Sequence, residues 1–101
     1  METKITKNGN VTLVEILKNG NPVNAQNPAT VDDLAPLLDF EEEGNEVAIV
    51  SGMPGWAVAA IVLKLKNLFT AIATYDPKLG GGVIVHSLTE KYKVGNIIPL
   101  E

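Results

Sequence analysis

The strongest constraint on the fold of this chain lies in residues 47–75. Residues 47–50 (Val-Ala-Ile-Val) are an uninterrupted apolar run typical of a central strand, and residues 69–75 are similarly apolar. Residues 56–68 between them are long enough for a helix and are polar only near their end. We expect the apolar positions of this helix to include Trp56, Ala60, Leu63 and either Leu68 or Phe69. Strand, helix and strand in this order predict one right-handed β-α-β crossover with parallel strands.

The rest of the chain completes one α/β domain over residues 1–101, with a small mixed sheet of about five to six strands and two helices. Asn-Gly at residues 8–9, between two alternating segments, predicts a β-hairpin because both residues tolerate positive φ. Residues 94–100 predict a last edge strand. Thr30 is suited to cap a short helix, whose apolar face would comprise Val31, Leu34, Leu37 and Leu38.

The ends of the two parallel strands are where a ligand site is expected. The carboxyl ends of parallel strands share one edge of an open α/β sheet, and ligands bind at that edge. Tyr75 and Asp76 end the second strand, while the loop after the first strand leads into a helix whose first amides are free to bind an anion. We therefore assign ligand binding to Ser51, Gly52, Met53, Pro54 and Gly55. A compact strand-to-helix turn would explain the same five residues without a ligand.

Residues 74–82 (Thr-Tyr-Asp-Pro-Lys-Leu-Gly-Gly-Gly) contain the candidate polar pair. Pro77 restricts Asp76 to extended geometry and cannot continue the hydrogen-bond ladder, so Asp76 leaves the sheet at a fixed point. Lys78 follows two residues later, and the glycines permit positive φ or close approach of a ligand, which makes Gly80 and Gly81 candidate ligand contacts. A tight hairpin with a polar turn is the alternative interpretation.

Charge and composition exclude some classes of protein. The net charge of −4 is unlike that of a basic nucleic-acid coat. Residues 1–50 carry three lysines against nine acids and residues 51–101 carry five lysines against three acids, so an anionic ligand is expected at the second half. All the cations are lysines, which bind phosphate as point charges. The three glutamates at 41–43 predict a solvated acidic turn more readily than a metal site.

Other features of the sequence indicate a soluble cytoplasmic protein without membrane contact. Cysteine is absent, no leader-like segment opens the chain, and its longest apolar stretch is far shorter than a membrane span. We expect His86, which ends the strand after the glycines, to be structural and to lie at the opposite edge from Asp76.

These motifs resemble one known family. The first part of the pattern is Ser-Gly at 51–52 followed by Pro54, Trp56 and a helix, and the second is Tyr-Asp-Pro-Lys-Leu-Gly at 75–80 before a Val-Ile-Val strand. Together these motifs are similar to those of the small Csx-type CRISPR-associated proteins of type III systems. The similarity is to the third numbered Csx family, which is classed as ring nucleases. It covers residues 46–101 well and the first 45 residues only in the order of elements.

The resemblance implies a ligand and a reaction. Members of that family bind cyclic tetra-adenylate, cleave its phosphodiester bonds with help from Mn²⁺, are also described as acting on 3′ adenylates of linear RNA, and hold the ligand between oligomeric partners, here a homodimer or a higher homo-oligomer. Carried across, Asp76 is the acidic catalytic and metal-binding residue and Lys78 stands where the family has arginine. Ser51 and Gly52 belong to the ligand-binding loop.

Two departures from the family pattern leave alternatives open. The family has an arginine in the Ser-Gly loop and a histidine near the end of the helix, whereas this chain has Met53 in the loop and no histidine in residues 64–69. The most obvious general acid or base is therefore missing. One hypothesis is a ring nuclease that switches off type III antiviral signalling, and another is a non-catalytic sensor or sponge that regulates a partner. A third is an unrelated α/β module whose glycines only shape turns.

Overall fold

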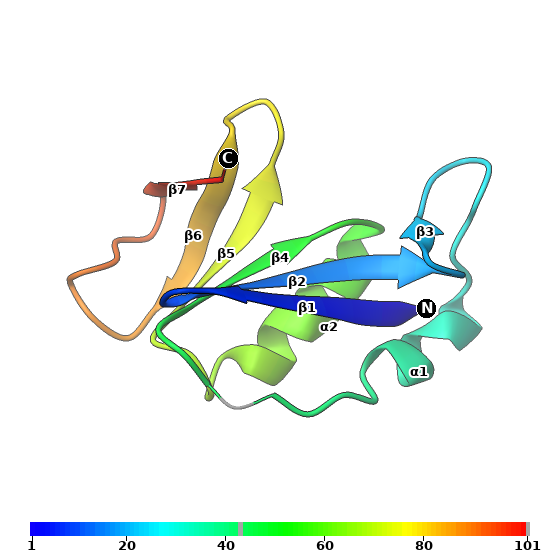
Figure 1. Cartoon of the computed structure of the whole chain (residues 1–101), viewed down its shortest axis with the longest axis horizontal. Coiled ribbons are helices and arrows are strands. Elements are labelled where there is room, and N and C mark those ends of the chain that lie inside the picture. The colour runs from blue at the N-terminus through cyan, green and yellow to red at the C-terminus, as the bar shows by residue number, and fades with distance from the viewer. Residues whose placement is uncertain (43, 101) are drawn as a thin grey trace.

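A mixed β-sheet with the strand order β1-β2-β4-β5-β6-β7 is the framework of the protein (Figure 1). The computed structural model describes residues 1–42 and 44–100. Its strands are β1 (Glu2–Asn8), β2 (Val11–Lys18), β3 (Asn21–Pro22), β4 (Val47–Ser51), β5 (Ala71–Asp76), β6 (Gly81–Ser87) and β7 (Ile97–Pro99). Its helices are the 3-10 turn η1 (Val31–Asp33), α1 (Leu34–Leu37) and α2 (Gly55–Leu65). The predicted α/β class, with a mixed sheet and two helices, is confirmed, and the short β3 pairs with β2 beside the main path.

The three central strands β2, β4 and β5 are parallel. Val14 of β2 lies beside Val50 of β4, and Val50 lies beside Thr74 of β5. The connection from β4 through α2 to β5 is the predicted crossover. The connection from β2 to β4 is a second crossover, which carries the predicted short helix α1. The parallel pairing of β2 with β4 was not predicted, because these two segments lie far apart in the chain. Both helices lie on the same face of the sheet, where Leu37 of α1 and Ile61 of α2 belong to one core (Figure 1).

The buried face of α2 differs from the expected one. Ala57, Ile61 and Leu65, which recur every four residues, are the fully buried residues of the helix. Trp56 and Leu63, two expected apolar positions, are 41% and 64% exposed. The helix is apolar around most of its circumference, so periodicity alone did not identify the face that packs on the sheet.

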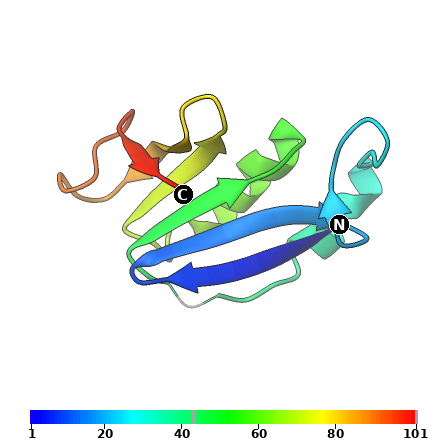
Figure 2. The ribbon, with the colours of Figure 1, turned by 45° about the horizontal axis from the view of Figure 1, so that its top comes forward.

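The other face of the sheet is covered by the C-terminal segment rather than by a helix. A second core cluster comprising Val47, Ile49, Ala71, Ala73 and Ile84 is packed against partly buried side chains that include Ile98 and Leu100. β7, the last strand of the sheet, pairs with β6 (Figure 2). The contact is close, because a Cβ atom added at Gly81 would lie 2.2 Å from the carbonyl oxygen of Ile98. The glycine at this position is therefore needed by the fold itself.

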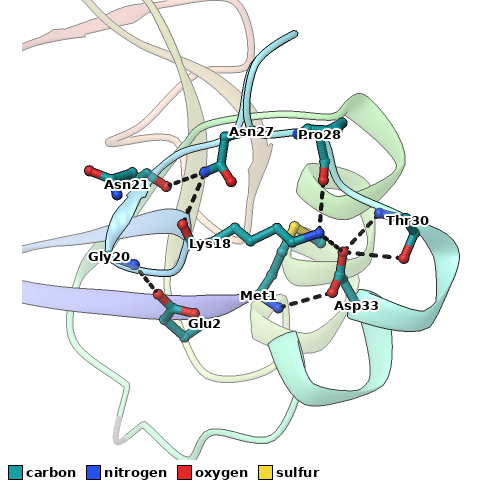
Figure 3. A network of polar contacts seen from close by, with 9 residues as sticks. All are labelled: Met1, Glu2, Lys18, Gly20, Asn21, Asn27, Pro28, Thr30 and Asp33. Carbon is teal, nitrogen blue, oxygen red and sulfur yellow. Dashed lines mark hydrogen bonds and ion pairs between the residues drawn. The ribbon is translucent and has the colours of Figure 1, made fainter.

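The segment between β2 and α1 is held by Lys18 and Asp33 (Figure 3). The ammonium of Lys18 donates to the carbonyl of Pro28 at 2.8 Å and to the carboxylate of Asp33 at 3.0 Å. The backbone amide of Thr30 also donates to Asp33, at 2.8 Å. This hydrogen bond, followed by the one from Lys18, lowers the pKa of Asp33 to about 2. Thr30 is the N-cap of η1, as predicted, and Asp33 completes a capping box by accepting the Thr30 amide. Val31, which was expected on the apolar face, is 79% exposed, whereas Leu37 is buried as expected.

Glu46, at the amino end of β4, connects the sheet to the loop between β6 and β7. Its carboxylate accepts hydrogen bonds from the Lys91 ammonium and the Tyr92 hydroxyl, and from the side-chain amide of Asn10 at 2.9 Å. Hydrogen bonds from Lys91, Tyr92 and Asn10, in that order of importance, lower the pKa of Glu46 to about 2. The same hydrogen bond to Glu46 raises the pKa of Tyr92.

The acidic run at residues 41–43 is partly fixed by an ion pair. Glu42 pairs with Lys7 at 2.5 Å and Glu41 is exposed, while Glu43, the third glutamate of the predicted turn, lies outside the described residues. Within residues 1–42 and 44–100, no group of three or more His, Cys, Asp or Glu side chains is placed to hold a metal ion. No helix in the same ranges has the length and hydropathy needed to cross a membrane.

The close contact at Gly81 predicts that alanine at this position destabilises the protein more than alanine at an uncrowded glycine. Gly81→Ala should lower the free energy of unfolding by about 1–3 kcal/mol, because the added methyl group must displace the backbone of β7. The matched control is Gly55→Ala, where an added Cβ meets nothing within 4 Å. This control should change stability by no more than about 1 kcal/mol. Urea unfolding monitored by circular dichroism measures both, and equal effects would contradict the proposed packing.

The environment of Glu46 predicts a pH-dependent stability. Its folded-state pKa of about 2 is below the ordinary value of 4.5, so its stabilising effect is present above that value and is lost as the pH falls through about 2. Glu46→Gln should therefore lower the urea midpoint at pH 7, and the difference from the wild type should shrink between about pH 5 and pH 2. Glu90→Gln, an exposed residue of the same loop, is the control. A difference that stays constant over this range would contradict the assignment.

Candidate functional site

The carboxyl edge of the parallel strands brings the two predicted segments together. β4 ends at Ser51 and β5 ends at Asp76, and the parallel register that joins Val50 to Thr74 places Ser51 next to Tyr75. Ser51 and Tyr75 also line the same small hollow. The predicted convergence of the Ser-Gly loop and the Tyr-Asp-Pro motif at one edge is confirmed.

The loop after β4 has a backbone geometry that requires glycine. Gly52 has a φ of +130°, and a Cβ atom at this position would lie 2.8 Å from the Cβ of Ile16. α2 then begins at Gly55, and the carbonyl of Pro54 accepts the amides of Ala57 and Val58 at 3.0 and 3.2 Å. The amides of the first residues of α2 have no preceding helical carbonyl to bond, so the helix presents free donors at this edge.

A groove of about 560 Å³ extends from this loop between α2 and the strands β5 and β6. Its lining includes Gly52, Gly55, Val58, Thr74, Tyr75 and Val85. Met53 and Trp56, which border the beginning of the helix, are 51% and 41% exposed. The groove therefore begins beside the N-terminus of α2 and is lined mainly by apolar residues, with Tyr75 as its aromatic residue.

A second, smaller hollow of about 200 Å³ lies on the opposite face of the sheet. It is lined by Leu13, Glu15, Ser51, Tyr75 and Leu100, so Tyr75 contributes to both hollows. Glu15 was not among the predicted site residues. Its signal in the sequence was its position as the single charged residue inside the apolar run 11–17, but nothing in the sequence alone placed it beside Ser51.

Asp76 is held in a turn by its own side chain. One carboxylate oxygen accepts the amide of Lys78 at 2.8 Å, and the Asp76 carbonyl accepts the amide of Leu79 at 3.2 Å. This is an Asx turn, in which the side chain fixes the backbone two residues ahead. Lys78 is exposed, and among the described residues its ammonium makes no ion pair. Asp76 and Lys78 are therefore close in the chain, while their charged groups are not paired with each other.

The two glycines predicted to contact a ligand have different environments. Gly80 is exposed, has a φ of +69°, and accepts the amide of Leu100 at 3.1 Å. Gly81 is buried against β7, as described above. Gly80 thus remains accessible from the hairpin tip, and Gly81 has a structural reason to lack a side chain.

Asp76 is the candidate metal ligand, but it is a single carboxylate. Mn²⁺ takes about six oxygen-type ligands in octahedral geometry. In the parts of the chain that the structure describes, no cluster of three acidic, histidine or cysteine side chains exists around Asp76 or elsewhere. The donor set of one chain therefore does not by itself fit a bound metal ion.

His86 lies away from the site, as expected. It pairs with Ile72 near the beginning of β5, whereas Asp76 ends that strand. Its Nε2 atom is buried and has no hydrogen-bond partner among the described residues. His86 therefore lies near the end of β5 opposite to Asp76.

The fold and the edge geometry define a small α/β protein in which a glycine-containing loop, a helix N-terminus and a polar hairpin meet at one sheet edge, the candidate ligand site. The chain matches a family model described as CRISPR-associated protein (Cas_csx3) over residues 23–99. Because this match covers more than half of the sequence, the chain belongs to that family. No curated protein sequence matches it. The matched range contains both the loop at 51–55 and the motif at 75–80.

The Asx turn at Asp76 predicts that two substitutions differ in stability. Asp76→Asn keeps a side-chain carbonyl that accepts the amide of Lys78, so it should leave the free energy of unfolding nearly unchanged. Asp76→Ala removes that acceptor and should cost about 1 kcal/mol. Urea unfolding at neutral pH measures both values. Equal stabilities of the two variants would show that the turn does not depend on this contact.

Proposed function

We propose that this CRISPR-associated protein binds cyclic tetra-adenylate at the carboxyl edge of β4 and β5 and hydrolyses its phosphodiester bonds, which would switch off type III antiviral signalling. One observation carries the proposal: the loop 51–55 and the hairpin that bears Asp76 and Lys78 meet at one sheet edge in a chain of this family. Family membership supports the CRISPR association, and the geometry supports a ligand at this edge.

The edge has suitable groups for a polyanionic ligand with aromatic bases. The free amides at the beginning of α2 and the unpaired ammonium of Lys78 are donors for phosphate oxygens. Trp56 and Tyr75 are partly exposed aromatic side chains on which adenine bases can stack. Contacts of these two kinds account for binding without requiring a strongly basic protein.

Cleavage requires an aligned attacking oxygen and neutralisation of the charge that develops on the phosphate. Lys78 is the side chain available for charge neutralisation, and the carboxylate oxygen of Asp76 that does not accept the Lys78 amide faces no partner among the described residues. Mn²⁺, when bound, would add a Lewis acid at the phosphate, with Asp76 as one ligand. The remaining ligands would have to come from outside this chain's own side chains.

A second copy of the chain is part of the proposal. One chain contributes one candidate carboxylate and one candidate lysine, whereas the proposed ligand repeats the same nucleotide four times around a ring. A symmetric homodimer or a higher homo-oligomer would present several such edges to one ligand. Adenylates at the 3′ end of a linear RNA offer the same chemical groups and are a second possible ligand of the same edge.

A non-catalytic sensor or sponge for cyclic oligoadenylate is the alternative. Residues 64–69 contain no histidine, and the loop contains Met53 where the family pattern has arginine. Without a group that titrates near neutrality, the edge has binding groups but lacks an obvious proton-transfer group. This observation favours binding over rapid turnover.

Incubation with cyclic tetra-adenylate, with and without Mn²⁺, tests both functions. We expect the ligand to be retained by the protein and to change the fluorescence of Trp56, the only tryptophan, and we expect linear products on chromatography. Asp76→Asn should reduce cleavage at least about 100-fold and change binding by no more than a few-fold, since the variant keeps the turn. Lys78→Met should weaken binding, and Lys93→Met is its charge-matched control.

The outcomes separate the hypotheses. Retention without any linear product, with or without the metal, would contradict the nuclease and support the sensor or sponge. Absence of retention of the cyclic ligand, together with cleavage of RNA that ends in 3′ adenylates, would move the function to linear RNA. Failure to bind either ligand would contradict the proposed function.

A further inference from the structure

A row of polar side chains crosses the sheet on the face opposite the helices. In the strand register, Lys4 of β1 lies opposite Glu15 of β2, and Glu15 lies opposite Ser51 of β4. Tyr75 of β5 follows in the same row. Neighbouring strands lie about 4.8 Å apart, so adjacent members of the row are within reach of one ligand. The row next to it consists mainly of apolar residues, among them Leu13, Ile49, Ala73 and Ile84.

Glu15 is exceptional among the acidic residues of the protein. Five described carboxylates are half-buried: those of Glu15, Asp33, Glu42, Glu46 and Asp76. All except Glu15 accept a hydrogen bond from, or form an ion pair with, another group of this chain. In residues 1–42 and 44–100 Glu15 has neither, although Lys4 is its cross-strand neighbour. A half-buried carboxylate without a protein donor is stabilised by a donor from solvent or from a ligand.

The surroundings of Glu15 indicate what that donor is. Glu15 lines the hollow of about 200 Å³ together with Ser51, Tyr75 and the apolar residues Leu13 and Leu100. An ionised carboxylate only accepts hydrogen bonds, so its ligand must donate. A lone carboxylate would repel a phosphate group, but the positive charge of Lys4, the cross-strand neighbour of Glu15, offsets this repulsion. A hydroxyl-bearing molecule with an aromatic ring and a phosphate, namely a ribonucleotide, satisfies all these groups.

We propose that Lys4, Glu15, Ser51 and Tyr75 form a ribonucleotide subsite in which the carboxylate of Glu15 accepts a hydrogen bond from the ribose 2′-hydroxyl. Lys4 and Ser51 contact the phosphate, and the base stacks on Tyr75. Because the 2′-hydroxyl distinguishes RNA from DNA, Glu15 makes the edge selective for ribonucleotides. This subsite rests on the proposed function only for the choice of adenine as the base, and it does not require cleavage.

Titration of the ¹⁵N-labelled full chain with adenosine 5′-monophosphate and with its 2′-deoxy analogue tests the subsite by NMR. The ribonucleotide should shift the amides of Glu15, Ser51 and Tyr75, and the deoxy analogue should bind about tenfold more weakly, as expected for a lost hydrogen bond to a charged group. Glu15→Val should abolish this preference, and Glu15→Gln should reduce it to a few-fold because a neutral carbonyl is a weaker acceptor.

Two control variants distinguish hydroxyl recognition from general charge. Lys4→Met should weaken both nucleotides equally and keep their ratio, while Glu90→Gln should change neither. An unaltered spectrum outside the row confirms that each variant is folded, and Glu15→Gln keeps the shape of the side chain if Glu15→Val does not fold. Equal affinities in the wild type, an unchanged ratio in both Glu15 variants, or shifts confined to other residues would overturn the subsite.

The same titrations separate this inference from the proposed function. If cyclic tetra-adenylate is retained but the ribose preference does not depend on Glu15, the subsite is wrong and the proposed function stands. If the ribose preference depends on Glu15 and the cyclic ligand is not retained, the proposed function is wrong and the subsite stands. If neither the cyclic ligand nor the mononucleotide binds, both are overturned.

Discussion

Parallel pairing of β2 with β4 and of β4 with β5 is the constraint on which the rest of this structure depends. Parallel strands cannot be joined by tight turns, so each connection must cross the sheet. Both connections cross on the same face, where Leu37 and Ile61 enter one core, and the opposite face is left to the C-terminal segment. The three strands also end at the same edge, so the sheet topology alone brings Glu15, Ser51 and Tyr75 together.

The parts of the fold that were predictable are those specified by neighbouring residues. The β1–β2 hairpin was predicted from Asn-Gly at residues 8–9, although its turn residues are Gly9 and Asn10 and Asn8 pairs with Val11. The apolar run at 47–50, followed by a helix-length segment, predicted the central crossover. The buried face of α2 was not predictable, because Trp56 and Leu63 are as apolar as the buried Ile61. The short helix α1 was predicted, but the second crossover was missed because the parallel pairing of β2 with β4 joins segments far apart in the chain.

The candidate site divides in the same way. The adjacency of Ser51 and Tyr75 follows from one crossover that the sequence indicates, whereas that of Glu15 and Ser51 depends on pairing between segments separated by the whole β2–β4 connection. Asp76 was correctly placed at the strand end, but its hydrogen bond to the Lys78 amide depends on a side-chain torsion that composition does not determine. The structural role of Gly81 was also not predictable, because the backbone of Ile98 that lies close to it belongs to a strand much later in the chain.

The contact between the hairpin tip and the C-terminal strand affects the entropy of binding. The Gly80 carbonyl accepts the amide of Leu100, and β7 lies against Gly81, so the turn that carries Asp76 and Lys78 is supported from one side by a separate segment. A ligand that meets a pre-organised turn has less conformational freedom to remove when it binds. Residues 97–100 would thus influence affinity through the rigidity of this turn, without contributing a charged group to the site.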